Sequence, residues 1–382
     1  MKNISITGGA GFIGQKFIKK LQSESLDFRI KVLDSFNPQI HDKLSEERFR
    51  KNFPEISLMA DDILNEDAID WLIKDVDIII HLAAETGTGQ SMYNIVDYTN
   101  TNITGTSLIL EKLLKANKSI DHFILSSSRS VYGEGAYQLS PEITLNQNLS
   151  RNIDDMKNGK FDIYCPETGK PLQAIATNEL FTTNPLSFYA ATKLFQEQQV
   201  DLYCKKLFKK TTIFRFQNVY GEGQSLSNPY TGLLAVFFNL ANTGKDLNVY
   251  EDGIESRDFI HVDDVVKTII VSILSKDTSW NGTFNLGTGI PTSIMDVASN
   301  VADFFSNNID IKVSGDFRVG DIRHNFADVK KINSLGIKTK EFIPFNIGYK
   351  SFLNWAKENG PTSFNIDEAT SIMKDSGMYH EN

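Results

Sequence analysis

The stretch Thr7–Gly14 reads TGGAGFIG and directly follows the short apolar run NISI. Its glycines satisfy two spacings: G-x-G-x-x-G at Gly9, Gly11 and Gly14, and G-x-x-G-x-x-G at Gly8, Gly11 and Gly14. Glycines between a strand and a helix permit a tight turn, and they let a pyrophosphate approach the N-terminal end of the helix. Because a glycine turn also occurs without a ligand, the interpretation needs a second feature.

Asp34 supplies that feature. It ends the apolar run RIKVLD, 20 residues after Gly14. An acid at this distance accepts hydrogen bonds from an adenosine ribose and repels a 2′-phosphate, so we expect NAD rather than NADP. The residues of these two stretches that we expect to bind NAD are Gly8, Gly11, Phe12, Ile13, Gly14 and Asp34.

Short apolar runs alternate with helix-period segments through the first half of the chain. The expected strands are 3–7, 29–34, 76–84, 121–127 and 211–216, and the expected helices are 12–22, 65–74, 94–117 and 188–208. This alternation predicts an α/β fold with a Rossmann-type, doubly wound parallel sheet. Strand ends should add further cofactor contacts from Asp62, Ile63, Leu82, Ala83 and Ala84.

The chain divides into three expected segments. Residues 1–180 form the NAD-binding domain and include an insertion at 134–184 that is too long for a plain loop, which suggests a functional or lid-like element. Residues 181–360 complete the Rossmann sheet and interleave with a smaller mixed α/β substrate-binding lobe. Residues 361–382 are polar and are expected to form a loosely held tail.

Composition narrows the class of protein. The net charge of −9 argues against a nucleic-acid partner, which would need clustered Lys and Arg. The two cysteines, Cys165 and Cys204, cannot form a disulfide framework, which fits a reducing compartment. We find neither an 18-residue apolar run nor a signal peptide, so a cytoplasmic protein without a membrane partner is expected.

The segment YAATK places Tyr189 and Lys193 four residues apart, on one face of a helix. A nearby ammonium group stabilises a phenolate, which makes tyrosine a usable base near neutral pH. A surface Tyr/Lys pair is the ordinary explanation of this spacing. The glycine motif and the serine-rich strand end at 126–128 favour the catalytic one.

Together these features resemble the extended short-chain dehydrogenase/reductase family, in particular its NAD-dependent nucleotide-sugar epimerases. The matching segments are TGGAGFIG, DDI, HLAA, NITGT, SSSRSVYG, SFYAATK, RFQNVYG and ESRDFIHVDD. The resemblance implies Ser128 as the catalytic serine, Tyr189 as the base and Lys193 as its activator. It implies further cofactor contacts from Asn102, Ser126, Tyr189 and Lys193.

The resemblance also implies how a nucleotide-diphosphate sugar is held. Arg257 and Arg323 look like the diphosphate-binding arginines, because a guanidinium group binds phosphate oxygens bidentately. The complete expected substrate set is Thr86, Ser128, Arg129, Asn218, Arg257 and Arg323.

The residues after Ser128 bear on the reaction. Related dehydratases carry acids directly after the catalytic Thr, whereas here Arg129 and Ser130 follow. Neither is a general base at neutral pH without a partner, so elimination lacks its obvious base. Epimerisation needs none, since NAD accepts the hydride and returns it. The sequence therefore favours an isomerase, a 4-epimerase acting through a transient 4-keto sugar.

The segment SSRSVYGEGAY and the insertion resemble a bacterial subgroup assigned as dTDP-L-rhamnose 4-epimerases, which form dTDP-6-deoxy-L-talose. The insertion holds one cysteine, Cys165, whereas this subgroup often has more, so we expect no metal. Alternatives are a UDP-glucose or UDP-N-acetylhexosamine 4-epimerase, a CDP-sugar 2-epimerase, an NADP-dependent reductase, which Asp34 opposes, and a non-catalytic NAD-binding regulatory scaffold. The family also implies a homodimer formed through the helices near 94–117 and 188–208.

Overall fold

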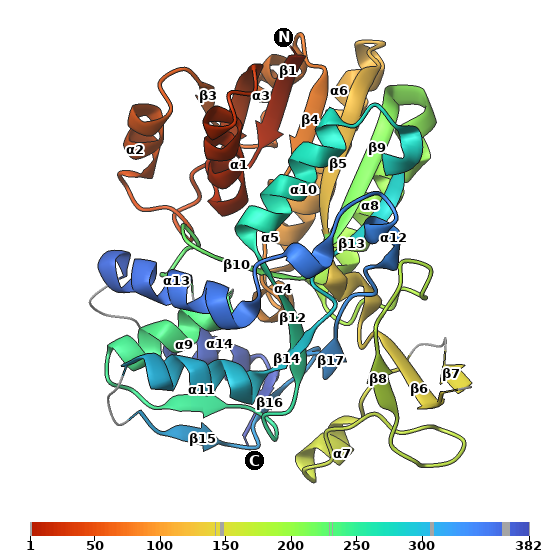
Figure 1. Cartoon of the computed structure of the whole chain (residues 1–382), viewed down its shortest axis with the longest axis vertical. Coiled ribbons are helices and arrows are strands. Elements are labelled where there is room, and N and C mark those ends of the chain that lie inside the picture. The colour runs from red at the N-terminus through yellow and green to blue at the C-terminus, as the bar shows by residue number, and fades with distance from the viewer. Residues whose placement is uncertain are drawn as a thin grey trace.

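The structure is a computed structural model. It describes residues 2–141, 143–145, 149–228, 230, 232–305, 309–360 and 367–381, with the backbone alone for 367–369. A seven-stranded sheet occupies one half of the molecule, and a smaller lobe and the insertion lie at one end of it (Figure 1).

All seven strands of the large sheet run parallel, in the order β13-β9-β5-β4-β1-β2-β3. Their bounds are β1 Lys2–Thr7, β2 Phe28–Asp34, β3 Ser57–Ala60, β4 Ile78–His81, β5 Ile120–Ser128, β9 Phe208–Phe216 and β13 Gly282–Leu286. The predicted Rossmann-type fold is confirmed. After β3 the chain crosses back through α3 to β4, which lies on the opposite side of β1 from β2, and this reversal of strand order creates the switch point at which such sheets bind ligands.

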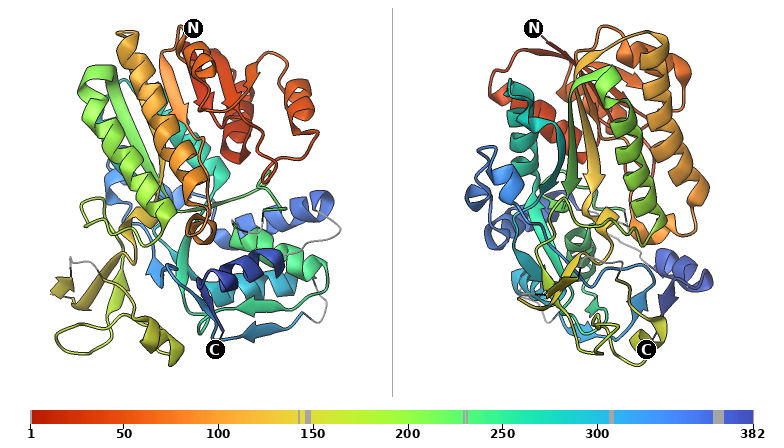
Figure 2. Two further views of the ribbon diagram at one scale, coloured as in Figure 1. Left: turned by 180° about the vertical axis from the view of Figure 1, so that it is seen from behind. Right: turned by 90° about the vertical axis from the view of Figure 1, so that its right-hand side faces the viewer.

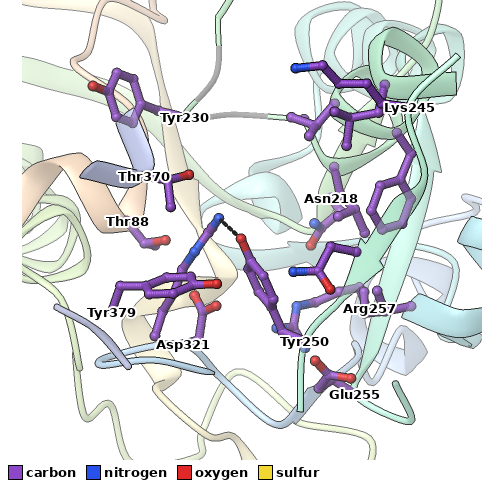
Figure 3. A pocket seen from close by; sticks show the side chains of 18 of the residues that line it. Thr88, Asn218, Tyr230, Lys245, Tyr250, Glu255, Arg257, Asp321, Thr370 and Tyr379 are labelled. Atoms are coloured by element: carbon purple, nitrogen blue, oxygen red, sulfur yellow. Dashed lines mark hydrogen bonds between the residues drawn. The ribbon is translucent and has the colours of Figure 1, made fainter. Parts of the chain in front are cut away.

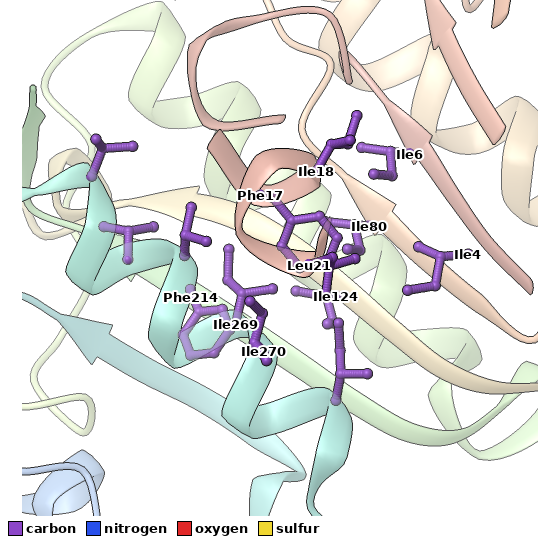
Figure 4. Close-up of a cluster of buried hydrophobic side chains, with 14 of the residues drawn as sticks. Ile4, Ile6, Phe17, Ile18, Leu21, Ile80, Ile124, Phe214, Ile269 and Ile270 are labelled. Atoms are coloured by element: carbon purple, nitrogen blue, oxygen red, sulfur yellow. The ribbon is translucent and has the colours of Figure 1, made fainter. Parts of the chain in front are cut away.

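Helices cover both faces of this sheet (Figure 2). One face carries α1 (Phe12–Ser23) and α10 (Val262–Leu274), and the other carries α3 (Glu66–Ile73), α6 (Gly105–Lys115) and α8 (Phe188–Leu207). On the first face, Phe17, Ile18 and Leu21 of α1 pack against the strands and against Ile269 of α10 (Figure 4). Each such buried side chain contributes about 1.5–3 kcal/mol, so this core fixes the position of the N-terminus of α1.

The expected helix at 94–117 has three parts. A short helix α5 (Ile95–Tyr98) leads into a π-helical turn, Thr99–Thr104, and then into α6. π-helical turns are rare and are often found at functional sites. This turn places Asn102, whose side chain is fully buried, beneath the segment that follows β4.

The smaller lobe is built from the second half of the chain, as the sequence indicates. Helices α9 (Leu233–Asn242), α11 (Ile294–Phe305) and α13 (Phe345–Asn359) share an apolar core that includes Phe238, Val297 and Phe352. Its remaining elements are β10 Asn218–Tyr220, β11 Leu247–Val249, β12 Ser256–His261, β14 Pro291–Ser293, β15 Ile311–Val313, β16 Phe317–Arg318 and β17 His324–Asn325. The short helix α12 (Lys330–Asn333) packs against β13 of the large sheet instead.

The insertion forms a small unit of its own. Three antiparallel strands, β6 (Ala136–Ser140), β7 (Ile143–Leu145) and β8 (Gln173–Ile175), accompany α7 (Ile153–Lys157). Cys165 lies in the apolar cluster of this unit. An ion pair of 2.6 Å joins Arg151 to Glu251 of the smaller lobe.

The C-terminal residues that the structure describes correct the expectation of a loosely held tail. They form helix α14 (Asp367–Asp375) and strand β18 (Tyr379–His380), which pairs with β16. Met373 and Tyr379 are buried. The polar composition of the segment hides these two anchors, which is why the sequence suggested a tail.

The helix α2 (Ser45–Asn52) lies at the edge of the sheet, beyond β3 (Figure 1).

Among the described residues, we find no helix whose length and hydrophobicity would allow it to cross a bilayer.

Candidate active site

A cavity of about 290 Å³ lies at the carboxyl ends of β1, β2, β3 and β4. The N-terminus of α1 opens onto it, so the unpaired amide groups of that helix face the space where an anion would bind. The expected cofactor and substrate residues that line it are Gly8, Gly11, Phe12, Ile13, Gly14, Asp34, Asp62, Ile63, Leu82, Ala83, Ala84 and Thr86.

The glycines fit a dinucleotide pyrophosphate. A Cβ atom on Gly8 would lie 2.7 Å from the Ala83 amide nitrogen, and one on Gly14 would lie 2.4 Å from the carbonyl oxygen of Gly9. Gly9 instead packs against Val32 and does not line the cavity. Of the two glycine spacings in the sequence, G-x-x-G-x-x-G is therefore the one that faces the cavity.

Asp34 is held in place by backbone amides. Its carboxylate accepts hydrogen bonds from the Ala10 amide at 2.9 Å and from the Phe36 amide at 3.0 Å. Burial raises its pKa, although these amides and His41, whose Nε2 lies 3.6 Å away, oppose that shift. The cavity lining holds acids and, among the described residues, neither Lys nor Arg. A 2′-phosphate would therefore meet no permanent cation, which fits NAD.

The Tyr/Lys pair lies at the end of β5. Lys193 is 2% exposed, and its ammonium group donates a hydrogen bond of 2.9 Å to the carbonyl oxygen of Ser126. Burial lowers the pKa of Lys193 to about 7. Burial raises the pKa of Tyr189, whereas a hydrogen bond with Ser128 and the charge of Arg129 act to lower it. Ser128 and Tyr189 both face a cavity of about 360 Å³.

Two neighbouring polar residues, Asn102 and Ser126, hold this arrangement in place, and Ser126 also lines the cavity around Ser128 and Tyr189. Asn102 accepts a hydrogen bond from the Glu85 amide at 2.8 Å and donates one to Thr192 at 2.9 Å. It therefore ties the segment after β4 to α8, and it lines none of the cavities at the site. Ser126 donates to the carbonyl oxygen of His81 at 2.9 Å.

The lining around Ser128 and Tyr189 contains no Asp or Glu among the described residues. Arg129 lies there instead, and its Nε donates to Asn218 at 2.8 Å. Burial and the positive charge of nearby Arg257 lower the pKa of Arg129 to about 9. Both effects disfavour the charged guanidinium group, and an anion bound beside it would stabilise that charge. The described residues of this lining therefore offer no carboxylate that could remove a carbon-bound proton for elimination.

A third cavity, of about 570 Å³, extends from this point into the smaller lobe (Figure 3). It shares Thr88, Arg129, Asn218 and Tyr230 with the cavity around Ser128, which in turn shares Ile13 and other residues with the first cavity. The three spaces form one cleft. It runs from the α1 N-terminus, past Tyr189, to the lobe.

Three arginines face the third cavity. They are Arg129, Arg257 and Arg318, and both Nη1 of Arg129 and Nε of Arg318 are buried without a hydrogen-bond partner. Arg257 uses Nη1 to hold the carbonyl oxygens of Ser256 at 2.9 Å and Arg323 at 3.1 Å. Unsatisfied guanidinium nitrogens beside an open space are suited to a diphosphate.

The expectation that Arg323 binds the diphosphate is wrong. Its side chain is fully buried, and Nη1 and Nη2 donate to Asp252 at 2.6 and 2.7 Å. Glu251 and Asp162 take its remaining donors. These acids come from distant segments, so nothing beside Arg323 in the sequence reveals them. Arg318, five residues earlier, lines the cavity instead. The only sequence feature that points to Arg318 is its position in the same short segment as Arg323.

Glu255 is a second residue that sequence reasoning missed. It lines the same cavity, is 6% exposed, and has one carboxylate oxygen buried without a hydrogen-bond partner. Burial and the neighbouring Glu251 raise its pKa to about 7.

His261 and Glu222 lie near α1 but not in the cleft. His261 caps α10 by accepting the Asp263 amide at 3.3 Å. Glu222, His261 and Asp263 lie close enough together to hold a metal ion. The ammonium group of Lys16 already lies 3.0 Å from Glu222 and 3.6 Å from Asp263, so a cation is supplied by the protein.

The fold and the site define a Rossmann-type, NAD-dependent enzyme. The family described as "NAD dependent epimerase/dehydratase family" matches residues 4–152 and 163–287. The chain therefore belongs to this family. The expected family, fold and NAD cofactor are confirmed.

Individual relatives cover nearly the whole chain. The dTDP-L-rhamnose 4-epimerase of Burkholderia thailandensis is 36% identical over 91% of this chain and 93% of its own length. A putative UDP-glucose 4-epimerase of Methanocaldococcus jannaschii is 28% identical over 94% of this chain and 100% of its own. The solved structure of the UDP-N-acetylglucosamine 4-epimerase of Methanobrevibacter ruminantium, with UDP-N-acetylmuramic acid bound, is 26% identical, with a TM-score of 0.72 over 94% of this chain and 99% of its own.

Proposed function

We propose that this protein is an NAD-dependent nucleotide-sugar 4-epimerase, an isomerase that inverts C4 through a transient 4-keto sugar. The observation that carries the proposal is the lining around Ser128 and Tyr189. It joins a Tyr/Lys pair to Arg129, and its described residues include no carboxylate for elimination. dTDP-L-rhamnose is the favoured substrate, supported by the relative that is 36% identical.

The protein residues have distinct tasks. Ser128 and Tyr189 bind the 4-hydroxyl group of the sugar, and the Tyr189 phenolate takes its proton. Lys193, held by the Ser126 carbonyl, favours that phenolate through its charge. NAD, when bound, accepts hydride from C4 and returns it. Gly8, Gly11 and Gly14, with the amides of α1, would hold its pyrophosphate.

Inversion requires the keto sugar to present its other face. Arg129, Arg257 and Arg318 would hold the diphosphate while the sugar turns in the space around Ser128, which measures about 360 Å³. An anchor at the diphosphate lets the sugar rotate without leaving the protein. Arg129, which replaces the dehydratase acid, therefore acquires a role in binding the substrate.

A UDP-hexose or UDP-N-acetylhexosamine 4-epimerase is the second candidate. The relative from M. jannaschii and the structure from M. ruminantium favour it, and the catalytic set serves either substrate equally. The candidate substrates differ in both the nucleotide and the sugar, so a direct comparison of substrates separates the two candidates.

The test is turnover of a panel of nucleotide sugars, followed by proton NMR in deuterated water. We expect dTDP-L-rhamnose to convert to its C4 epimer without deuterium at C3 or C5. Conversion of UDP-glucose or UDP-N-acetylglucosamine alone would favour the second candidate. Loss of water from any substrate would contradict both.

We further propose a cytoplasmic homodimer. Exposed apolar residues support the dimer: Ile95 and Val96 on α5 and Phe195 and Leu202 on α8. These helices lie on one face of the sheet, where a second copy would cover them. Light scattering that gives the mass of one chain at micromolar concentration would contradict the dimer.

A further inference from the structure

The C-terminal segment Asp367–Glu381 folds back onto the substrate lobe. Strand β18 pairs antiparallel with β16, which places Tyr379 opposite Arg318. The Val319 amide donates to the Met378 carbonyl at 3.0 Å. The segment is therefore attached directly to the strand that carries one of the cavity arginines.

Four residues of the segment line the 570 Å³ cavity. They are Thr370, Ser371, Lys374 and Tyr379. In Figure 3, Thr370 and Tyr379 lie on the side of the cavity opposite Asn218 and Arg257. The segment thus forms a wall of the space, rather than a cover outside it.

Tyr379 anchors this wall. It is 8% exposed, and its hydroxyl group donates a hydrogen bond of 2.5 Å to Asp316. Its ring packs edge-on against Tyr250, with the ring centres 5.6 Å apart. Lys374, which pairs with Glu381, lies 5.3 Å from the Tyr379 ring centre and brings a further cation to the wall.

The same contacts determine where Arg318 lies. Its guanidinium carbon lies 4.8 Å from the ring centre of Tyr250, and Nη2 donates to the Tyr250 hydroxyl at 3.1 Å, the dashed line in Figure 3. Tyr250 is itself packed against Tyr379. Removing the Tyr379 ring would remove a packing partner of Tyr250. Tyr250, and the Arg318 side chain that it holds, would then be less well positioned.

We propose that the C-terminal segment is a working part of the substrate site: Tyr379 positions Arg318, and the segment walls the cavity that takes the nucleoside diphosphate. This inference rests on the proposed function for the identity of the ligand. Tyr379 acts through Tyr250 and Arg318 and is a positioning residue.

The test compares full-length variants. Tyr379→Ala removes the ring, Tyr379→Phe keeps it and loses only the bond to Asp316, and Ile372→Ala changes an exposed side chain of α14 that does not line the cavity. Calorimetry measures binding of dTDP and UDP, and the NAD content of each purified variant reports an intact cofactor half.

We expect Tyr379→Ala to weaken binding of the preferred nucleotide at least about tenfold, Tyr379→Phe about two- to fourfold and Ile372→Ala less than twofold, all with unchanged NAD content. In turnover, the Tyr379→Ala change should appear in KM, with kcat within about twofold. A merely structural role would lower stability without this split between KM and kcat.

Nucleotide binding by Tyr379→Ala within twofold of the wild-type value, at full NAD content, would overturn the inference. If Tyr379→Ala does not fold, Lys374→Ala decides, with a threefold loss of nucleotide binding supporting the inference and no change overturning it. Calorimetry needs no turnover, so the two proposals fail separately. If the variants lose dTDP affinity in the expected order, the inference about the C-terminal segment stands, even when no sugar is epimerised. The absence of epimerisation would contradict the proposed function alone.

Discussion

The cofactor half and the substrate lobe of this protein are built in different ways. The cavity at the α1 N-terminus takes most of its lining from short segments that follow strands of one parallel sheet. The substrate cavity takes its lining from Thr88, from the residue after β5, from β10 to β12, from β16 and from the C-terminal segment. From Thr88 to Tyr379 these span about 290 residues. A site of the first kind can be read from local motifs, whereas the second depends on long-range packing.

The largest expected effect tests the catalytic pair on the cofactor side. Tyr189→Phe removes the base and should lower kcat by about 10²–10⁴-fold, the usual contribution of general-base catalysis. Turnover by NMR measures it, with Tyr203→Phe, on the exposed face of α8, as the matched control. Unchanged turnover of every accepted sugar by Tyr189→Phe would remove Tyr189 from the mechanism.

The second prediction concerns Arg323, where sequence and structure disagree. Arg323→Ala leaves Glu251 with Arg151 as its remaining cation and breaks the ion pairs with Asp252 and Asp162. Breaking a buried ion pair typically costs about 3–5 kcal/mol in the free energy of unfolding. Denaturant unfolding measures the loss, and Arg50→Ala, an exposed arginine on α2, should change the value by less than about 0.5 kcal/mol. A stable Arg323→Ala protein with a raised KM would restore the original diphosphate assignment.

Arg318 should behave in the opposite manner. Arg318→Ala removes a charged hydrogen-bond donor from the cavity, and a loss of about 1.5–3 kcal/mol corresponds to roughly a 10–150-fold rise in KM. Steady-state kinetics measures the rise, and unfolding should show a far smaller change than for Arg323→Ala. Equal effects of both variants on KM and stability would erase the distinction between the two arginines.

The smallest expected effect is a pH dependence from Glu255. Burial and Glu251 raise its pKa to about 7, while Arg257 and Arg323 oppose the shift. Above pH 7 the group ionises beside Arg257, and its negative charge should repel the diphosphate. The substrate KM should therefore rise by about three- to tenfold between pH 6 and pH 8, consistent with about 1 kcal/mol of Coulomb repulsion. Glu255→Gln should flatten the profile, and an unchanged pH profile in that variant would exclude Glu255 as its cause.

The contrast explains what the sequence could predict. Gly8, Gly11, Gly14 and Asp34 are fixed by the local strand-turn-helix geometry, and Tyr189 and Lys193 by one helical turn, so their positions at the cleft followed from spacing. Arg318 and Arg323 lie in one short segment, and the choice between them depends on Glu251, Asp252 and Asp162, which only the folded chain brings together.

The C-terminal segment and the insertion show the same limit. Tyr379 is buried beside Asp316, and Met373 is buried beside Gly89. Both partners are distant in the sequence, and the residues next to Tyr379 and Met373 are mostly polar, so no local pattern predicts their burial. The insertion was expected to be a functional or lid-like element. None of its described residues from 134 to 184 lines the cleft, and Arg151 and Glu134 instead connect it to Glu251 and to the Arg323 amide of the lobe. Long-range ion pairs of this kind leave no periodic signal.

The central claim is that hydride leaves C4 and returns to C4 of the same sugar. The most direct measurement uses dTDP-L-rhamnose labelled with deuterium at C4, incubated in ordinary water and followed by NMR and mass spectrometry. The account predicts the C4 epimer with the deuterium retained at C4 and none lost to solvent. Washout of the label, release of water, or an unchanged substrate at full NAD content would contradict it.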